Sequence, residues 1–176
     1  MNATVQPLAE GLHQLRLEGR SANPHWVLSP FSGLSREGVS IVAGRATRGD
    51  QRHWRAEFDL DFAGTETPPA RLDYESMTRQ PVEATVAEAP QLSRWVIART
   101  SDGSLELTVE GSDQIGFLGR LLAKLSGVGL FPVAIEINTV AGRIRDRFVL
   151  RGIGGASPSA TVERVLATIL DRALPA

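Results

Sequence analysis

The chain has 176 residues, of which 42% are apolar and 22% charged, a composition typical of one or two globular domains. Nineteen basic side chains against twenty acidic ones give a formal net charge of -1, so no overall field favours nucleic acid or anionic lipid as a partner. There is no cysteine, which excludes disulfides, thiolate metal sites and a cysteine nucleophile, and fits a reducing compartment.

The first half of the chain combines strand patterns with one helical pattern. Residues 4–8 predict a strand that turns through Glu10-Gly11 into a second strand over 12–18. A helical segment ends at "LSREG", and "VSIVAGRAT" and "HWRAEFDLDF" flank a Gly49-Asp50 turn, which predicts a hairpin. Residues 63–91 are rich in Pro, Thr and Glu, and predict a short helix over about 70–78 and then a connector between two domains.

The second half shows the same order more clearly. Residues 92–100 predict a strand that turns at Asp102-Gly103 into an alternating strand through residue 110. From Ile115 the apolar spacing becomes helical and stops at "SGVG". "PVAIEINTV" and "RIRDRFVLR" then form a hairpin, and residues 162–174 predict a second amphipathic helix.

Two pairs of similar segments indicate an internal duplication. "LRLEG" corresponds to "LTVEG", and "LSREG" to "LSGVG", at a separation of about 91 residues. We therefore predict an α+β protein of two ferredoxin-like βαββα units with antiparallel sheets, over residues 1–80 and 81–176. Only Pro175-Ala176 follow the last helix, so the edge strand of each unit is expected before the first core strand. Because small open sheets expose their edges, the two repeats should pack together, or the chain should form a homodimer.

The junction of strand and helix in the second half carries a family resemblance. "D-Q-I-G-F-L" at Asp113 to Leu118, followed by a glycine-containing turn and "IEINTVAGRIRDRFVL", resembles an ACT domain. The sequence of that hairpin is similar to the C-terminal ACT repeats of bacterial uridylyltransferase/uridylyl-removing enzymes. The match covers roughly residues 105–150, and the first repeat matches in layout only.

The resemblance implies an amino acid bound between paired domains and the regulation of an attached or partner enzyme. The ligand-binding residues that it implies are Asp113, Gln114, Ile115 and Gly116. Ile115 stands where the family often has proline. In the first repeat Trp26 stands roughly where Gly116 would be, so the site is expected in the second repeat alone.

The glycine-flanked Asp113 has two interpretations. In the first, Gly116 lets a ligand approach the backbone, the N–H groups of the helix start take its carboxylate, and Asp113 holds its ammonium group or orients the loop. The facing wall would then come from a neighbouring domain, with the start of its second strand as a candidate. In the second, Asp113 is only an N-cap worth about 1 kcal/mol, and Gly116 only relieves crowding.

Other candidate sites are weaker. The arginines of the last hairpin resemble a basic stripe for RNA, but Glu106 and Glu110 on the neighbouring strand favour a ladder of charge pairs. Asp146 is the one charged residue among inward-facing apolar positions, so it lies either near a strand end or at an interface. The spacing of the three histidines does not predict a metal site, and no motif predicts a catalytic centre or a cofactor.

These observations favour a stand-alone tandem ACT protein that senses an amino acid and regulates a partner enzyme without being an enzyme itself. The alternative is a structural or protein-interaction module without a ligand. No apolar run approaches the roughly 18 residues that a membrane-spanning helix needs, and the N-terminus has no signal-peptide pattern. We therefore expect a cytoplasmic protein without membrane or nucleic-acid partners.

Overall fold

A computed structural model describes residues 1–8, 11–21, 26–79 and 91–175, with Gln51 described by its backbone only. Its strands are β1 (Asn2–Pro7), β2 (Leu12–Arg20), β3 (Ser40–Arg48), β4 (His53–Asp61), β5 (Leu92–Arg99), β6 (Leu105–Ser112), β7 (Phe131–Val140) and β8 (Arg143–Arg151). Its α-helices are α1 (Leu28–Arg36), α2 (Tyr74–Met77), α3 (Phe117–Gly127) and α4 (Ala160–Asp171). The protein is therefore of the α+β class, as the sequence predicts.

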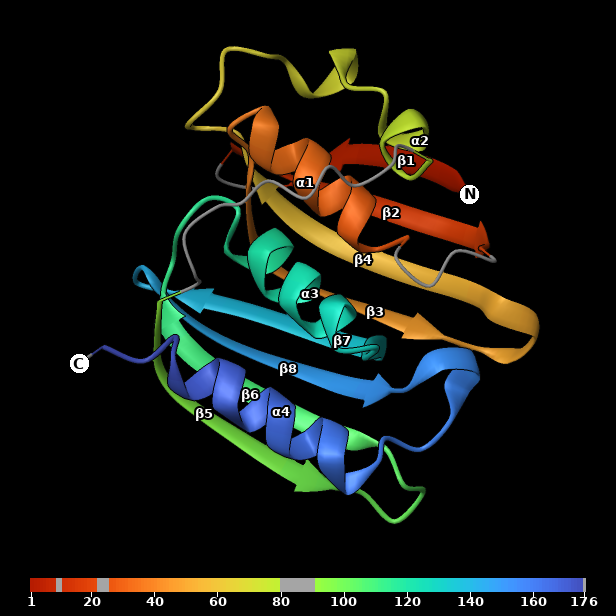
Figure 1. The fold of residues 1–176 in the computed structure, drawn as a ribbon. Helices are drawn as coiled ribbons and strands as arrows, with labels where there is room; N and C mark the ends of the chain where they lie inside the picture. The colour runs from red at the N-terminus through yellow and green to blue at the C-terminus, as the bar shows by residue number, and fades with distance from the viewer. Residues whose placement is uncertain (9–10, 22–25, 80–90, 176) are drawn as a thin grey trace.

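All eight strands belong to one antiparallel sheet, in the order β1-β2-β4-β3-β7-β8-β6-β5. The order of the second half mirrors that of the first, so the halves are related by a pseudo-twofold axis between β3 and β7 (Figure 1). In each half the strand that precedes the first core strand, β1 or β5, takes the outer edge. This placement confirms the predicted position of the edge strands and is consistent with ferredoxin-like units.

Details of the backbone repeat between the halves. Gly38 after α1 and Gly129 after α3 both adopt a left-handed conformation with φ of 74°. In both places the next residue donates its N–H back into the last helical turn, to Leu34 at 2.9 Å and to Leu125 at 3.0 Å. A β-bulge follows in each half, between Ile41 and Ala43 and between Pro132 and Ala134. These corresponding features support the internal duplication.

The two repeats join along the pair β3–β7, which runs from Ala43–Asn138 to Thr47–Ala134. The expectation of two separate sheets is thus corrected, because the halves share one sheet. The repeats pack together within the chain, which was one of the two predicted ways to protect the sheet edges. Pairing into a homodimer stays a prediction, as do the domain limits near residue 80, which fall outside the described residues.

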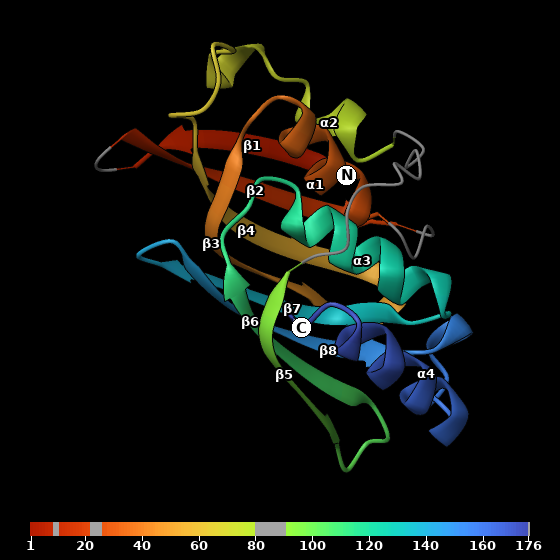
Figure 2. The ribbon, with the colours of Figure 1, turned by 60° about the vertical axis from the view of Figure 1, so that its left-hand side comes forward.

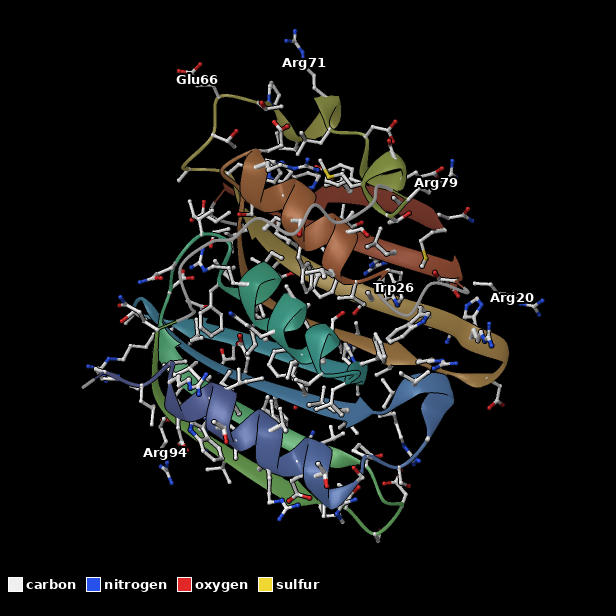
Figure 3. All side chains as sticks on the ribbon, viewed as in Figure 1. Arg20, Trp26, Glu66, Arg71, Arg79 and Arg94 are labelled. Atoms are coloured by element: carbon white, nitrogen blue, oxygen red, sulfur yellow. The ribbon has the colours of Figure 1, made fainter. Side chains whose placement is uncertain are left out.

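The helices cover one face of this sheet, with α1 and α3 side by side over the seam between the repeats (Figures 1 and 2). The predicted apolar face of α3 is buried, with Leu121 1% and Leu125 0% exposed. In the first half, the ring of Trp26 lies 4.9 Å from that of Trp54 and is fully buried (Figure 3). One apolar core therefore runs under the helices of both halves.

The other face of the sheet carries the predicted ladder of charge pairs. Arg147 binds Glu106 at 2.7 Å and Glu136 at 3.2 Å, and Arg145 lies 3.5 Å from Glu110. Arg151 instead reaches Asp102 in the β5–β6 turn at 2.7 Å. These side chains are partly exposed, so each pair contributes little to stability. Arg145 and Arg147 are thus paired with carboxylates of neighbouring strands, and Arg151 with one in a turn.

Replacing the buried Leu121 with a charged residue tests whether the two halves share one core. Leu121→Asp removes a burial worth about 1.5 to 3 kcal/mol and adds the cost of an unpaired buried carboxylate. We expect urea denaturation followed by circular dichroism to show loss of folding in both halves, because α3 covers the seam. Val165→Asp on α4 is the control, since Val165 is 44% exposed. It should cost about 0.5 to 1 kcal/mol. Unfolding of the second half alone would contradict a shared core.

Candidate functional site

A pocket lies beside the seam, where the loop before α3 meets the first repeat. Its cavity volume is about 30 Å³, and the empty space is about 390 Å³ when the space open to solvent is included. The predicted Asp113, Gln114, Ile115 and Gly116 all line it. The facing wall consists of Phe31 and Ser35 of α1, Val39, and Ser40 and Ile41 of β3; the floor includes Ile137, Thr139, Ile144 and Asp146. β3 is the second core strand of the first repeat. The start of that strand was the predicted candidate for the facing wall.

The loop before α3 is held in shape by α3 itself. Gly116 precedes the helix in a left-handed conformation with φ of 82°. The backbone N–H of Arg120 donates to the Gly116 carbonyl at 3.0 Å. Its guanidinium donates to the carbonyl of Ile115 and to Oε1 of Gln114, each at 3.2 Å. The loop therefore does not depend on a ligand for its conformation.

Gly116 lies at a contact between the repeats. A Cβ at this position would lie 2.7 Å from Oγ of Ser35 and 3.1 Å from a guanidinium nitrogen of Arg120. Ser35 of α1 in the first repeat therefore lies beside Gly116, which also lines the pocket, and the role of Gly116 in admitting a ligand stays a prediction. A bulky residue there would disturb the fold as well as the pocket.

Asp113 is not the N-cap of α3, so the capping interpretation is wrong. No side chain caps this helix, and the residue at the N-cap position is Gly116. The backbone N–H of Asp113 donates to the Gly142 carbonyl in the β7–β8 turn at 2.9 Å. Burial raises the pKa of its carboxyl, and the charge of Asp61 adds to the effect, while a backbone hydrogen bond from Gln114 opposes it.

Asp146 lies on the floor of the pocket and is 1% exposed. β7 pairs with β8 up to Glu136–Arg147 and again from Thr139–Ile144. Between these pairs the Asn138 backbone N–H donates to Oδ1 of Asp146 at 3.1 Å. Asp146 thus lies near the start of β8 and lines the pocket together with residues of the first repeat.

The second oxygen of Asp146, Oδ2, is buried and has no hydrogen-bond partner among the described residues. Burial raises the pKa of this carboxyl to about 7, opposed by the Asn138 N–H and reinforced by the charge of Asp113. Oγ1 of Thr139, which also lines the pocket, is buried and unpartnered within the described part of the chain. Such atoms are uncommon in folded proteins and call for an explanation.

The pseudo-twofold axis produces a counterpart of this pocket in the first repeat. It is smaller, with an empty space of about 220 Å³, and is lined by Val27, Leu28, Leu122, Ser126, Leu130, Phe131 and Pro132. No carboxylate occurs among these lining residues. By the positions of Gly38 and Gly129 after α1 and α3, the fully buried Trp26 corresponds to Phe117, which is 3% exposed, and not to Gly116 as the sequence suggested. Residues 22–25, which correspond to the Asp113–Gly116 loop, fall outside the described residues, so a site in the second repeat alone stays a prediction.

Sequence reasoning found the loop but missed part of the pocket. Asp146 had a usable signal, since it is an acidic residue at an inward-facing strand position. Thr139 and Ser35 had none, because threonine and serine are ordinary on strand and helix surfaces. No three His, Cys, Asp or Glu side chains of the described residues come together as a metal site.

No family model matches the chain, and no curated protein is similar to it in sequence. Among solved structures, it is similar to an aspartate kinase from Synechocystis, with 12% identity and a TM-score of 0.52. The match covers 92% of this chain but only 27% of that one. An unknown protein from Galdieria sulphuraria matches with 16% identity and a TM-score of 0.30, over 92% of this chain and 89% of that one.

The likeness to the kinase supports an ACT-like fold for this chain. It does not extend to the narrower similarity with uridylyltransferase repeats, and at this identity it shows the fold alone. Among the described helices, none is long and apolar enough to cross a membrane.

The contact between Gly116 and Ser35 can be tested by a double-mutant cycle. Gly116→Ala introduces both backbone strain and a clash, whereas Gly142→Ala, at φ of 72° with nothing within 4 Å of its Cβ, introduces strain alone. We expect Gly116→Ala to lower the free energy of unfolding by about 1 kcal/mol more than the control. Ser35→Gly should recover part of that difference. Equal costs for the two alanine variants would contradict the contact.

The unpaired carboxylate of Asp146 predicts a pH dependence of stability. The folded protein binds more protons at this group than the unfolded chain between pH values near 3.8 and about 7, so the group's contribution to stability falls as pH rises through that window. Asp146→Asn should therefore raise the free energy of unfolding at pH 8 by about 1 to 3 kcal/mol, and much less at pH 4.

The exposed Asp171→Asn at the end of α4 is the matched control and should be neutral at both pH values. Urea denaturation of the three proteins provides the comparison. An Asp146→Asn variant that is no more stable than the unmodified protein at pH 8 would show that the carboxylate has a partner in solution.

Proposed function

We propose that this chain is a stand-alone tandem ACT protein that binds an amino acid in the pocket between its repeats and thereby regulates a partner enzyme. The observation that carries the proposal is the composition of the pocket: the Asp113–Gly116 loop of one repeat faces β3 of the other, with two carboxylates and the start of α3 around one space.

The two ends of an amino acid have complementary groups in this pocket. Leu118 and Gly119 lie in the first turn of α3 and line the pocket. Backbone N–H groups in a first helical turn have no intrahelical acceptor and favour a carboxylate. Asp113 and Asp146 favour an ammonium group on the other side. A neutral sugar would interact less favourably with both the helix N–H groups and the carboxylates.

The regulatory part of the proposal rests on the ACT-like fold and on the resemblance of the β7–β8 hairpin to uridylyltransferase repeats. A ligand in this pocket touches both repeats, so its binding energy can change how firmly they pack together. Regulation then requires only that a partner enzyme distinguish the two packings. No step of the proposal gives the chain a chemistry or a cofactor of its own, and we place it in the cytoplasm.

A thermal-shift screen against the twenty amino acids tests the proposal. A ligand at 100 times its dissociation constant should stabilise the protein by about 2.7 kcal/mol. Asp113→Asn should weaken that stabilisation, because an amide cannot offer the ammonium group a negative charge, whereas Asp171→Asn should leave it unchanged. If no amino acid raises the melting temperature, the alternative of a structural or protein-interaction module without a ligand is favoured.

A further inference from the structure

We infer that Asp146, with Thr139, recognises a second cationic group of the ligand, so that the pocket takes a compound with two positive groups, such as a basic amino acid, rather than a neutral one. The inference rests on the proposed function, because it concerns the same pocket. It goes beyond that function by assigning the ligand class and two residues that the loop motif does not include.

The first argument is the balance of charge. Asp113 and Asp146 line the same pocket, and Asp61 at the end of β4 adds its field to that of Asp113. The guanidinium of Arg120 is turned to the loop before α3, where it donates to the Ile115 carbonyl and to Oε1 of Gln114. A ligand with one ammonium group can form an ion pair with one of these two carboxylates and leaves the other without a cationic partner.

The second argument is the pair of unsatisfied atoms. Oδ2 of Asp146 and Oγ1 of Thr139 are both buried, both belong to pocket-lining residues, and both lack a partner in the described residues. A carboxylate oxygen and a hydroxyl oxygen are acceptors that an ammonium or guanidinium group can satisfy together. An apolar side chain in this space would leave both atoms unpaired, at the cost that buried polar groups carry.

Among the described residues, no cation lies within hydrogen-bond reach of Oδ2 of Asp146. On β6 it faces Val109, on β7 the Asn138 N–H and Thr139, and from the loop before α3 it feels the charge of Asp113. The α1 wall contributes Phe31 and Ser35, which carry no charge. Because the carboxyl titrates near pH 7, binding of a cation releases a proton, and affinity should rise with pH.

Pairs of probes that differ only in a side-chain cation measure how much that cation contributes to binding. Lysine is compared with norleucine, arginine with citrulline, and cadaverine serves as a diamine without a carboxylate. By calorimetry at pH 8, lysine or arginine should bind the unmodified protein about tenfold or more tightly than its neutral counterpart. Asp146→Asn should remove most of this preference, and Thr139→Val should reduce it, while Asp171→Asn keeps it.

Affinity for the basic probe should fall from pH 8 to pH 6 in the unmodified protein but not in Asp146→Asn.

The outcomes distinguish the inference from the proposed function. Binding of neutral amino acids as tight as that of the basic ones overturns the inference and leaves the function in place. Binding of cadaverine alone supports the recognition of two cations and counts against an amino-acid ligand. A preference for lysine that survives in Asp146→Asn, with its folding verified by urea denaturation, also overturns the inference. No binding of any probe rejects both.

Discussion

The pairing of β3 with β7 is the interaction on which the rest of the structure depends. It joins two four-stranded halves into one sheet and covers an edge on each. It also brings α1 beside α3, so that Ser35 lies against Gly116, and it places the start of β3 opposite the loop before α3. Without this pair of strands neither the shared core nor the pocket would exist.

A pseudo-twofold seam produces two equivalent pockets, and the side chains decide which of them can hold a polar ligand. In the first repeat the space is small and its described lining has no carboxylate, beside a core filled by Trp26 and Trp54. In the second repeat Asp113 and Asp146 line the larger space. Duplication explains the shared backbone, and divergence of a few residues explains why the two sites differ.

Much of the fold was predictable because its signals are local. Alternating strands, the glycines after the first helix of each repeat and the turn signals before the first core strands together indicated ββαββα units. The seam was not predictable, since nothing in the residues of β3 or β7 specifies a partner strand from the other repeat. For the same reason the sequence could not show that Ser35, far away in the chain, lies beside Gly116. The segment from Asp113 to Gly116 located the loop, but it could not show that the Asp113 side chain does not cap α3.

Asp146 departs from the otherwise consistent pattern of this sequence, in which apolar residues face the helices. An isosteric asparagine or an apolar residue would remove the cost of a buried carboxylate, so stability alone does not explain an aspartate there. Local departures of this kind are expected where function requires them. A binding partner for the free oxygen would recover that cost on binding, and a compound without a cation would recover none of it. The same carboxylate that lowers the stability of the free protein would then be the source of ligand selectivity.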